Sequence, residues 1–328
     1  MVRIWIGWLA VGLAFLTLGL GGCGLKLLTW DQEVAMGLEA APQMTAEFGG
    51  ATPDDTVQAY VDEVGAKLVD GIEQDVPTDL PWSFTLLDSG VINAFALPGG
   101  QVYISRGLAE RFSSEAEMAG VLGHEIGHVT ARHGNQRISA QIGLNLLLTG
   151  ASIAVGAADE DSVLREYGSL AVPGLSIGSN VLLLKYGRDE ELEADMLGMR
   201  YMARAGYNPI GQRRVMETLQ AASGPRSQPE WLSTHPASST RIARIDELLA
   251  TEFAGTQRNA SFVTNEAAYE RRMLARLARL PPPRHGSQGL SLLDTPSLWC
   301  VHCASAAGSS PNSLDQLPQA MRRVSSSE

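Results

Sequence analysis

The chain has 328 residues, 45% hydrophobic and 19% charged, which suits one large domain or two small ones with a sizeable core. Its formal net charge of -11 argues against nucleic acid as the main partner, because phosphate binding needs a basic surface. No stretch is strongly basic, so electrostatic docking onto anionic lipid is not indicated either.

Residues 1–22 have the pattern of a secretory signal peptide, with a basic start, an apolar run and small residues at the cleavage site. Residues 20–23, Leu-Gly-Gly-Cys, resemble a bacterial lipobox, which implies that Cys23 carries lipid and that residues 23–29 form a tether. Gly24 is not the aspartate that usually retains such lipoproteins in the inner membrane, so the resemblance favours the periplasmic face of the outer membrane. The alternative is an uncleaved membrane anchor, since the apolar run is near the minimum length of a span.

Two helices are predicted next in the chain, and residues 30–48 form the first. Thr52 as a cap, followed by Pro53 at the first helical position, predicts the start of the second. Five apolar residues at helical spacing predict its buried face: Val57, Tyr60, Val61, Val64 and Leu68. We expect both helices to pack against the central helix.

A short sheet is predicted within residues 82–105. Residues 82–87 alternate as a strand does, and Pro98-Gly99-Gly100 predicts a turn between two further strands. An edge strand here could bind an extended peptide by strand addition, with Asn93, Ala94 and Gly100 as candidate substrate contacts. An ordinary structural hairpin is the alternative.

The central motif is His-Glu-Ile-Gly-His at residues 124–128. On a helix, His124 and His128 lie on one face about one turn apart, so both imidazoles can bind one metal ion. Glu125 can then act as general base on a water molecule, as in zinc peptidases. The neighbouring residues are uncharged, as a buried metal-binding helix requires, whereas the alternative is a helix with two histidines by chance.

The ends of this helix limit the class of metal site. Ser114 and Glu117 predict a capping box at its start, and we expect its end near His133. His133 follows the second candidate ligand by five residues, so it is predicted to face away in a structural role. The metzincin extension is excluded, because Ala131 and Gly134 stand where that pattern needs glycine and histidine.

Two apolar stretches follow, at residues 142–158 and 170–184. Each is short for a membrane span, so a helical hairpin that forms a wall or lid beside the site is the preferred interpretation. A shallow membrane contact is the next alternative, and a spanning hairpin is the least favoured.

A third metal ligand must come from another segment, and the acidic run at residues 188–195 is the strongest candidate. Glu191 and Asp195 are four residues apart on a predicted helix, so Glu191 could bind zinc while Asp195 orients a ligand histidine. Glu190 and Glu193 are expected to be exposed. The alternative is a solvated acidic run that caps the helix start.

Two residues beyond a helix that starts at Asn208-Pro209 are further candidates. His235 precedes Pro236, so its backbone is held extended in a loop. If this loop reaches the cleft, His235 could stabilise an oxyanion, or bind zinc as a fourth ligand and keep an enzyme latent. A loop histidine that only caps a helix is the alternative. Arg241 could pair with the acidic cluster or contact substrate.

The C-terminal part divides into a helix and a tail. Residues 251–280 include a basic amphipathic helix, which the prolines at 281–283 end. Residues 281–328 are rich in Ser, Pro and Gly and are predicted to be disordered. Cys300 and Cys303 lie in this tail, where a local disulfide is the plain interpretation for a protein outside the cytoplasm.

Four separated motifs, at residues 93–100, 124–128, 191–195 and 235–236, resemble in this order the CAAX prenyl protease/HtpX-like family of zinc metallopeptidases, which are gluzincins. The resemblance covers roughly residues 30–250. It implies a mostly helical α+β fold of the zincin type, with a small antiparallel sheet beside the metal-binding helix. The closest branch looks like the periplasmic one that includes the β-barrel assembly-enhancing protease, but residues 250–328 show no 34-residue tetratricopeptide period.

The same resemblance assigns roles within this chain. It implies that His124, His128 and Glu191 bind one Zn²⁺, that Glu125 is the general base and that Asp195 supports the site. The expected activity is that of a membrane-tethered zinc endopeptidase that cleaves unfolded or misassembled envelope proteins, which would be its partners together with the membrane itself. The competing class is a chaperone-like binding protein with zinc as a structural clamp. Glu125 favours the enzyme, because a purely structural site needs no carboxylate beside a water molecule.

Overall fold

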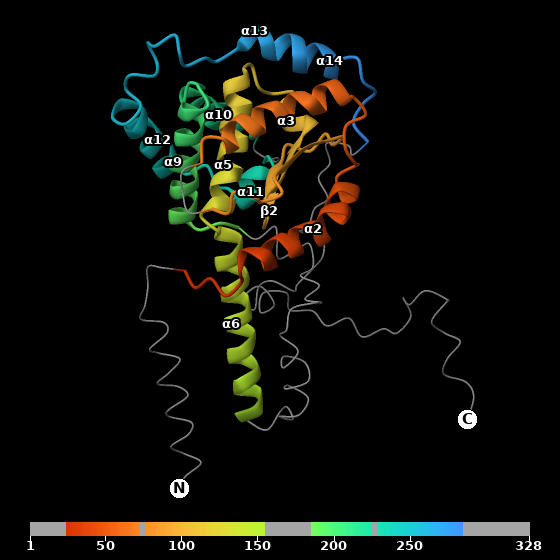
Figure 1. Ribbon diagram of the computed structural model, residues 1–328, viewed down its shortest axis with the longest axis vertical. Coiled ribbons are helices and arrows are strands. Elements are labelled where there is room, and N and C mark those ends of the chain that lie inside the picture. Colours follow the sequence, from red (N-terminus) through yellow and green to blue (C-terminus); the bar gives the residue numbers. More distant parts are fainter. Residues whose placement is uncertain (1–23, 73–75, 155–184, 225–227, 285–328) are drawn as a thin grey trace, which may run out of the picture. The chain divides into compact units, whose positions relative to one another are not determined.

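The structure, a computed structural model, describes residues 24–72, 76–154, 185–224 and 228–284, with only the helical backbone for residues 144–154. The leader with Cys23, the apolar stretch at 170–184 and the two tail cysteines lie outside these residues. The fold is α+β and mostly helical, as expected, and Figure 1 shows its arrangement. The longer helices are α2 (Trp30–Glu47), α3 (Asp55–Val69), α5 (Glu115–Thr130), α6 (His133–Ala154), α9 (Arg188–Arg204), α10 (Ile210–Ala222) and α12 (Ser239–Ala250).

Shorter elements complete the described part. The three strands are β1 (Ser83–Leu87), β2 (Ala94–Leu97) and β3 (Gln101–Ser105). The short helices are α4 (Arg106–Ala109), α11 (Trp231–Thr234), α13 (Glu266–Tyr269) and α14 (Ala275–Leu277), and a π-helical turn, η1 (Glu270–Leu274), joins the last two. Within the predicted C-terminal segment the helical elements cover residues 266–277, with a π turn in their middle.

The sheet is mixed rather than antiparallel. Strand order is β1-β3-β2, and β3 pairs parallel with β1 and antiparallel with β2. The predicted hairpin joins β2 and β3, and its turn needs two residues of positive φ, Gly99 (85°) and Gly100 (109°). Because β3 enters between the two earlier strands, β2 lies at one edge of the sheet, beside α5.

The central helix α5 is buried along its whole length and packs on α3, α9, α10 and β2 (Figure 1). Its approach to α9 is close because glycines face each other in the contact. A Cβ built on Gly198 of α9 would lie 2.8 Å from the carbonyl carbon of Gly123 on α5. Such contacts bring the acidic start of α9 next to the histidines of α5.

The start of α3 differs from the prediction. Its cap is Asp54, whose Oδ1 accepts the backbone N–H groups of Thr56 and Val57 at 2.9 and 3.1 Å. A carboxylate that accepts two helix N–H groups satisfies more of the helix start than a threonine hydroxyl at Thr52 would. The predicted buried face of α3 is confirmed in full.

The central helix also ends earlier than predicted. Ser114 caps α5 as expected, with its Oγ accepting the Glu117 N–H. At the other end α5 stops at Thr130, Arg132 takes a left-handed conformation with φ of 61°, and α6 begins at His133. Residues 142–154 of the first apolar stretch belong to α6. None of the helices in the described residues is long and apolar enough to cross a membrane.

Candidate metal centre

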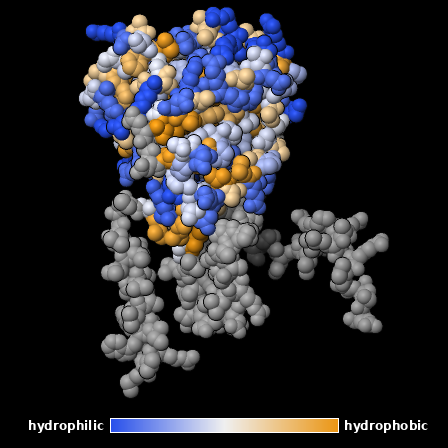
Figure 2. All heavy atoms as spheres, viewed as in Figure 1, coloured by the Kyte–Doolittle hydropathy of each residue, from blue (hydrophilic) through white to orange (hydrophobic). Residues whose placement is uncertain are grey.

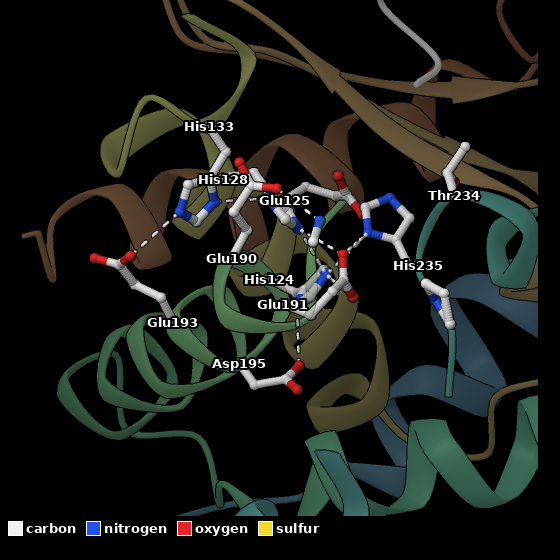
Figure 3. A network of polar contacts seen from close by, with 12 residues as sticks. His124, Glu125, His128, His133, Glu190, Glu191, Glu193, Asp195, Thr234 and His235 are labelled. Atoms are coloured by element: carbon white, nitrogen blue, oxygen red, sulfur yellow. Dashed lines mark hydrogen bonds and ion pairs between the residues drawn. The ribbon is translucent and has the colours of Figure 1, made fainter. Parts of the chain in front are cut away.

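The two histidines of the central motif meet at the middle of the site (Figure 3). Both are buried on α5, and their Nε2 atoms lie 3.1 Å apart. The spacing expected from helical geometry is thus confirmed.

Two further side chains complete the group. Glu191, on the first turn of α9, places Oε1 3.4 Å from His128 Nε2 and Oε2 3.7 Å from His124 Nε2. His235, just after α11, places Nδ1 2.9 Å from Glu191 Oε1 and 3.2 Å from His124 Nε2. One donor atom from each of the four residues lies within 4.8 Å of the others.

The chemistry of these atoms fits a bound cation. His124 Nδ1 faces Asp195 Oδ1 at 3.0 Å, and His128 Nδ1 faces His133 Nδ1 at 2.9 Å, so the outer nitrogen of each ring lies close to a polar atom. If both outer nitrogens carry the proton, the two facing Nε2 atoms present lone pairs to each other, which a cation between them would stabilise. Their separation is close to the about 3.3 Å between tetrahedral zinc ligands at 2.0–2.1 Å.

The surroundings tune the charges of these ligands. Burial lowers the pKa of His128 well below its ordinary value, which keeps the ring neutral and its lone pair available. Burial alone would raise the pKa of Glu191, but His235, His128 and Arg241 together hold it below the usual range. A neutral imidazole and an ionised carboxylate are the forms that bind zinc.

Glu125 lies beside the ligand group and is fully buried. Trp231 Nε1 donates a hydrogen bond of 3.0 Å to its Oε1. Its Oε2 has no hydrogen-bond partner within the described parts of the chain. One oxygen is therefore held in place while the other is free to accept a proton.

Arg241 pairs with two acidic residues of α9. Its Nε and Nη2 each lie 2.7 Å from an oxygen of Asp195, and its Nη1 pairs with Glu191 Oε2. Only 1% of the Arg241 surface is exposed, which favours the predicted pairing with the acidic cluster, and a substrate contact stays a prediction. Burial alone would raise the pKa of Asp195, but the Arg241 charge holds it below its ordinary value.

His133 does not face away from the site, in contrast to the prediction. Its Nδ1 contacts His128, and its Nε2 lies 3.3 Å from Glu193 Oε2. The prediction assumed one continuous helix, and the left-handed Arg132 breaks that helix. Glu193 is exposed as expected, and Glu190 caps the start of α9 by accepting the Gly187 N–H at 2.6 Å.

Three residues near the site gave no functional signal in the sequence. Tyr186 stacks on His128 with ring centroids 3.7 Å apart, and its N–H donates to the Thr234 carbonyl. Trp231 stacks on His235 at 4.8 Å. Gln212 of α10 donates to Asp195 Oδ1 at 2.8 Å. The cavity beside His128, which Tyr186 helps to line, is about 20 Å³, room for about one water molecule.

The candidate substrate contacts lie along β2 and its turn. Asn93 is buried and donates to Glu230 Oε1 at 3.2 Å, while the Trp231 N–H bonds the Ile92 carbonyl. Ala94 is buried in β2, and Gly100 lies in the turn, where its carbonyl accepts the Ser83 N–H. The start of β2 is thus covered by α11, and substrate binding at these residues stays a prediction.

Comparison with known proteins gives matches over most of this fold. A family model described as "Peptidase family M48" matches residues 55–249. The β-barrel assembly-enhancing protease of Yersinia pestis is 30% identical over 227 residues, which cover 66% of this chain and 43% of the relative. The mitochondrial metalloendopeptidase OMA1 of Schizosaccharomyces pombe is 30% identical over 224 residues, which cover 67% of this chain and 61% of the relative. The chain spans less than two thirds of the length of either relative.

Proposed function

Because the chain belongs to peptidase family M48, and is a metallopeptidase by that membership, we propose that it is a membrane-tethered, zinc-dependent endopeptidase of unfolded or misassembled cell-envelope proteins. The observation that carries the proposal is the convergence of two imidazole nitrogens and one carboxylate on a point beside the buried Glu125. The substrate class rests on the relatives, some of which are named for assembly of β-barrel proteins.

The roles of the chain's own residues follow from their contacts. His124, His128 and Glu191 would hold the ion, and Asp195 orients His124 through its Nδ1. A bound Zn²⁺ supplies Lewis-acid chemistry, which acidifies a water molecule and polarises a carbonyl group. Glu125, held by Trp231 through Oε1, uses its free Oε2 to take the proton from water and return it to the leaving amine.

With His235 as a fourth ligand, the described arrangement corresponds to a resting state. Four protein ligands complete a tetrahedron, whereas catalytic zinc sites keep one position open. His235 is one of the four, and the stacked Trp231 bonds the catalytic carboxylate. We infer that a substrate displaces His235, and that the segment which carries both rings moves with it.

The proposed tether is compatible with the surface near the N-terminal end of the described chain. Hydrophilic residues cover much of the face drawn in Figure 2, with apolar residues in smaller groups. Among the described residues the exposed large hydrophobic side chains are Leu25, Leu27, Leu38 and Val263. Two of these four directly follow the position proposed for lipid attachment, where a membrane surface would cover them.

Hydrolysis of an unfolded protein tests the proposal. The full-length chain, purified in detergent and loaded with zinc, should cleave casein, and Glu125→Gln should abolish cleavage while zinc stays bound. His235→Ala serves as a second background, in case the wild type is latent. Cleavage that persists in Glu125→Gln would contradict the proposed role of Glu125.

One observation favours a second function, a chaperone-like protein with a structural zinc clamp. Structural zinc sites have four protein ligands, and His235 supplies a fourth here. Such a protein would bind unfolded casein without cleaving it, in both the wild type and His235→Ala. Binding without cleavage in both proteins would therefore replace the first proposal.

A further inference from the structure

The two α5 histidines are held in different ways at their outer nitrogens. His124 Nδ1 faces the Asp195 carboxylate directly at 3.0 Å. His128 Nδ1 instead faces a second imidazole, His133, at 2.9 Å, and that ring reaches the Glu193 carboxylate at 3.3 Å (Figure 3). Metal-binding histidines usually donate their outer N–H to a carboxylate or carbonyl, which fixes the tautomer and ring orientation. His128 thus reaches a carboxylate through one intermediate ring.

The hydrogen bonds that join His128, His133 and Glu193 can run in only one direction. An ionised carboxylate only accepts, so it fixes the proton of His133 on Nε2 and leaves a lone pair on His133 Nδ1. That lone pair can accept only if His128 carries its own proton on Nδ1. The His128 Nε2 then presents its lone pair toward Glu191 and His124. Glu193 can in this way select the tautomer that binds metal without touching it.

The end of α5 and the left-handed residue after it place His133 between His128 and Glu193. In a continuous helix five residues turn by about 500°, so His133 would lie about 140° away from His128. Arg132, with φ of 61°, takes a left-handed conformation that is strained for a residue other than glycine, and it replaces that helical turn. Glu33 of α2 holds the break through bonds of 2.7 Å from Arg132 Nε and from Asn135 Nδ2. A strained turn with its own supporting contacts fits a positioning role better than a loose helix end.

His133 is buried whereas Glu193 is exposed, so the two residues can be tested by different substitutions. His133 is fully buried, so its ring has no alternative partner in solvent. The Glu193 side chain is 53% exposed and lines an open cleft of about 580 Å³ together with Asp189. The outer carboxylate can therefore be changed without disturbing the core.

We propose that His133 and Glu193 are positioning residues of the metal centre, which hold His128 with its Nε2 directed at the ion. This inference rests on the metal binding in the proposed function, but not on proteolysis. It predicts an effect on zinc affinity that can be measured without any substrate.

The first test replaces His133. Zinc affinity of the full-length chain in detergent is measured by competition with a fluorescent chelator. His133→Phe keeps a ring but no acceptor, and should weaken zinc binding about 10–100-fold. His133→Asn restores an acceptor near the position of Nδ1, and should stay within about 3-fold of the wild type. Unchanged affinity in His133→Phe, or equal losses in both variants, would overturn the proposal.

The second test replaces the exposed carboxylate, so it does not depend on the folding of a variant in the core. Glu193→Ala should weaken zinc binding several-fold, whereas Asp189→Ala, which removes the same charge from the same cleft, should leave it unchanged. The double variant His133→Phe, Glu193→Ala should bind zinc like His133→Phe alone, because Glu193 acts through His133. Equal losses from both carboxylates, or an additive double variant, would overturn the role of Glu193.

The outcomes separate this inference from the proposed function. A wild type that binds no zinc would contradict both. A wild type that binds zinc and cleaves casein, with His133→Phe of equal affinity, would contradict the positioning role alone.

Discussion

His235 illustrates how one side chain can control both metal binding and access. Its Nδ1 lies within hydrogen-bond distance of two candidate metal ligands, while its ring stacks on Trp231. A ligand that must leave before catalysis contributes to affinity and opposes activity at the same time. The two roles that the sequence left open for His235 therefore predict opposite effects on the rate.

His235→Ala should weaken zinc binding, because one of four ligands is lost, and should raise peptide hydrolysis at saturating zinc. Chelator competition and casein cleavage measure the two effects. Adding Glu125→Gln to His235→Ala should remove the gain, which assigns it to this site. A fall in hydrolysis at saturating zinc would instead support oxyanion stabilisation, and no change in either property would exclude both roles.

Arg241 contributes to stability because it neutralises two buried carboxylates. Arg241→Met leaves Asp195 and Glu191 without their cationic partner, which should lower the free energy of unfolding by about 3–5 kcal/mol. Arg244→Met is the matched control, since Arg244 pairs with Glu247 at the surface with 40% of its side chain exposed. We expect a change below about 1 kcal/mol there.

Urea unfolding of the zinc-free protein measures both variants and separates the packing effect from metal binding. Equal losses in Arg241→Met and Arg244→Met would show that the buried pairs add nothing beyond a surface ion pair. Retention of the full wild-type stability in Arg241→Met would mean that the two carboxylates are protonated or solvated without the guanidinium.

At the scale of elements, the contact between α5 and α9 fixes the distance from the histidines to Glu191. Gly198→Ala places a methyl group 2.8 Å from backbone atoms of Gly123 and His124, which cannot rotate away. We expect a loss of about 1–3 kcal/mol in unfolding free energy and weaker zinc binding, as α9 moves outward. Gly143→Ala, on α6 with no described residue within 4 Å of the added carbon, should instead gain up to about 1 kcal/mol.

Urea unfolding measures the stability of Gly198→Ala and Gly143→Ala, and chelator competition measures their zinc affinity. The two substitutions are chemically identical, so changes of opposite sign in the free energy of unfolding would show the effect of the close approach of the helices. If Gly198→Ala were as stable as Gly143→Ala and bound zinc normally, the helix contact would be looser than the structure has it.

Local sequence patterns predicted much of the fold, whereas the features that they missed depend on long-range contacts. Hydrophobic spacing predicted α3 and the Pro98-Gly99-Gly100 turn predicted the hairpin, because both signals lie within a few residues. The break after α5 had no such signal: an arginine adopts positive φ there, held by Glu33 from 99 residues away. Helical spacing alone therefore could not predict the contact between His133 and His128.

The whole molecule brings the site together from three distant segments. The His-Glu-x-x-His spacing and the acidic run predicted three residues that the structure brings together from α5 and α9, since each pattern reports one helix face. Gln212 and Tyr186 could not be assigned, because nothing in their local sequence distinguishes them from ordinary core or loop residues. Their positions follow only from how α10 and the start of α9 pack around α5.

Metal removal should destabilise the whole fold, because the ligands join α5, α9 and the segment after α11. A ligand that binds only the folded state adds about 2.7 kcal/mol at a free concentration of 100 times its Kd. For a domain of this size the thermal midpoint should therefore fall by roughly 5–10 °C when a chelator removes zinc. Glu125→Gln should keep this shift, since Glu125 is not a ligand, whereas Glu191→Ala should lose most of it. Differential scanning calorimetry with zinc and with chelator measures the shift, and an equal shift in Glu191→Ala would locate the stabilising ion elsewhere.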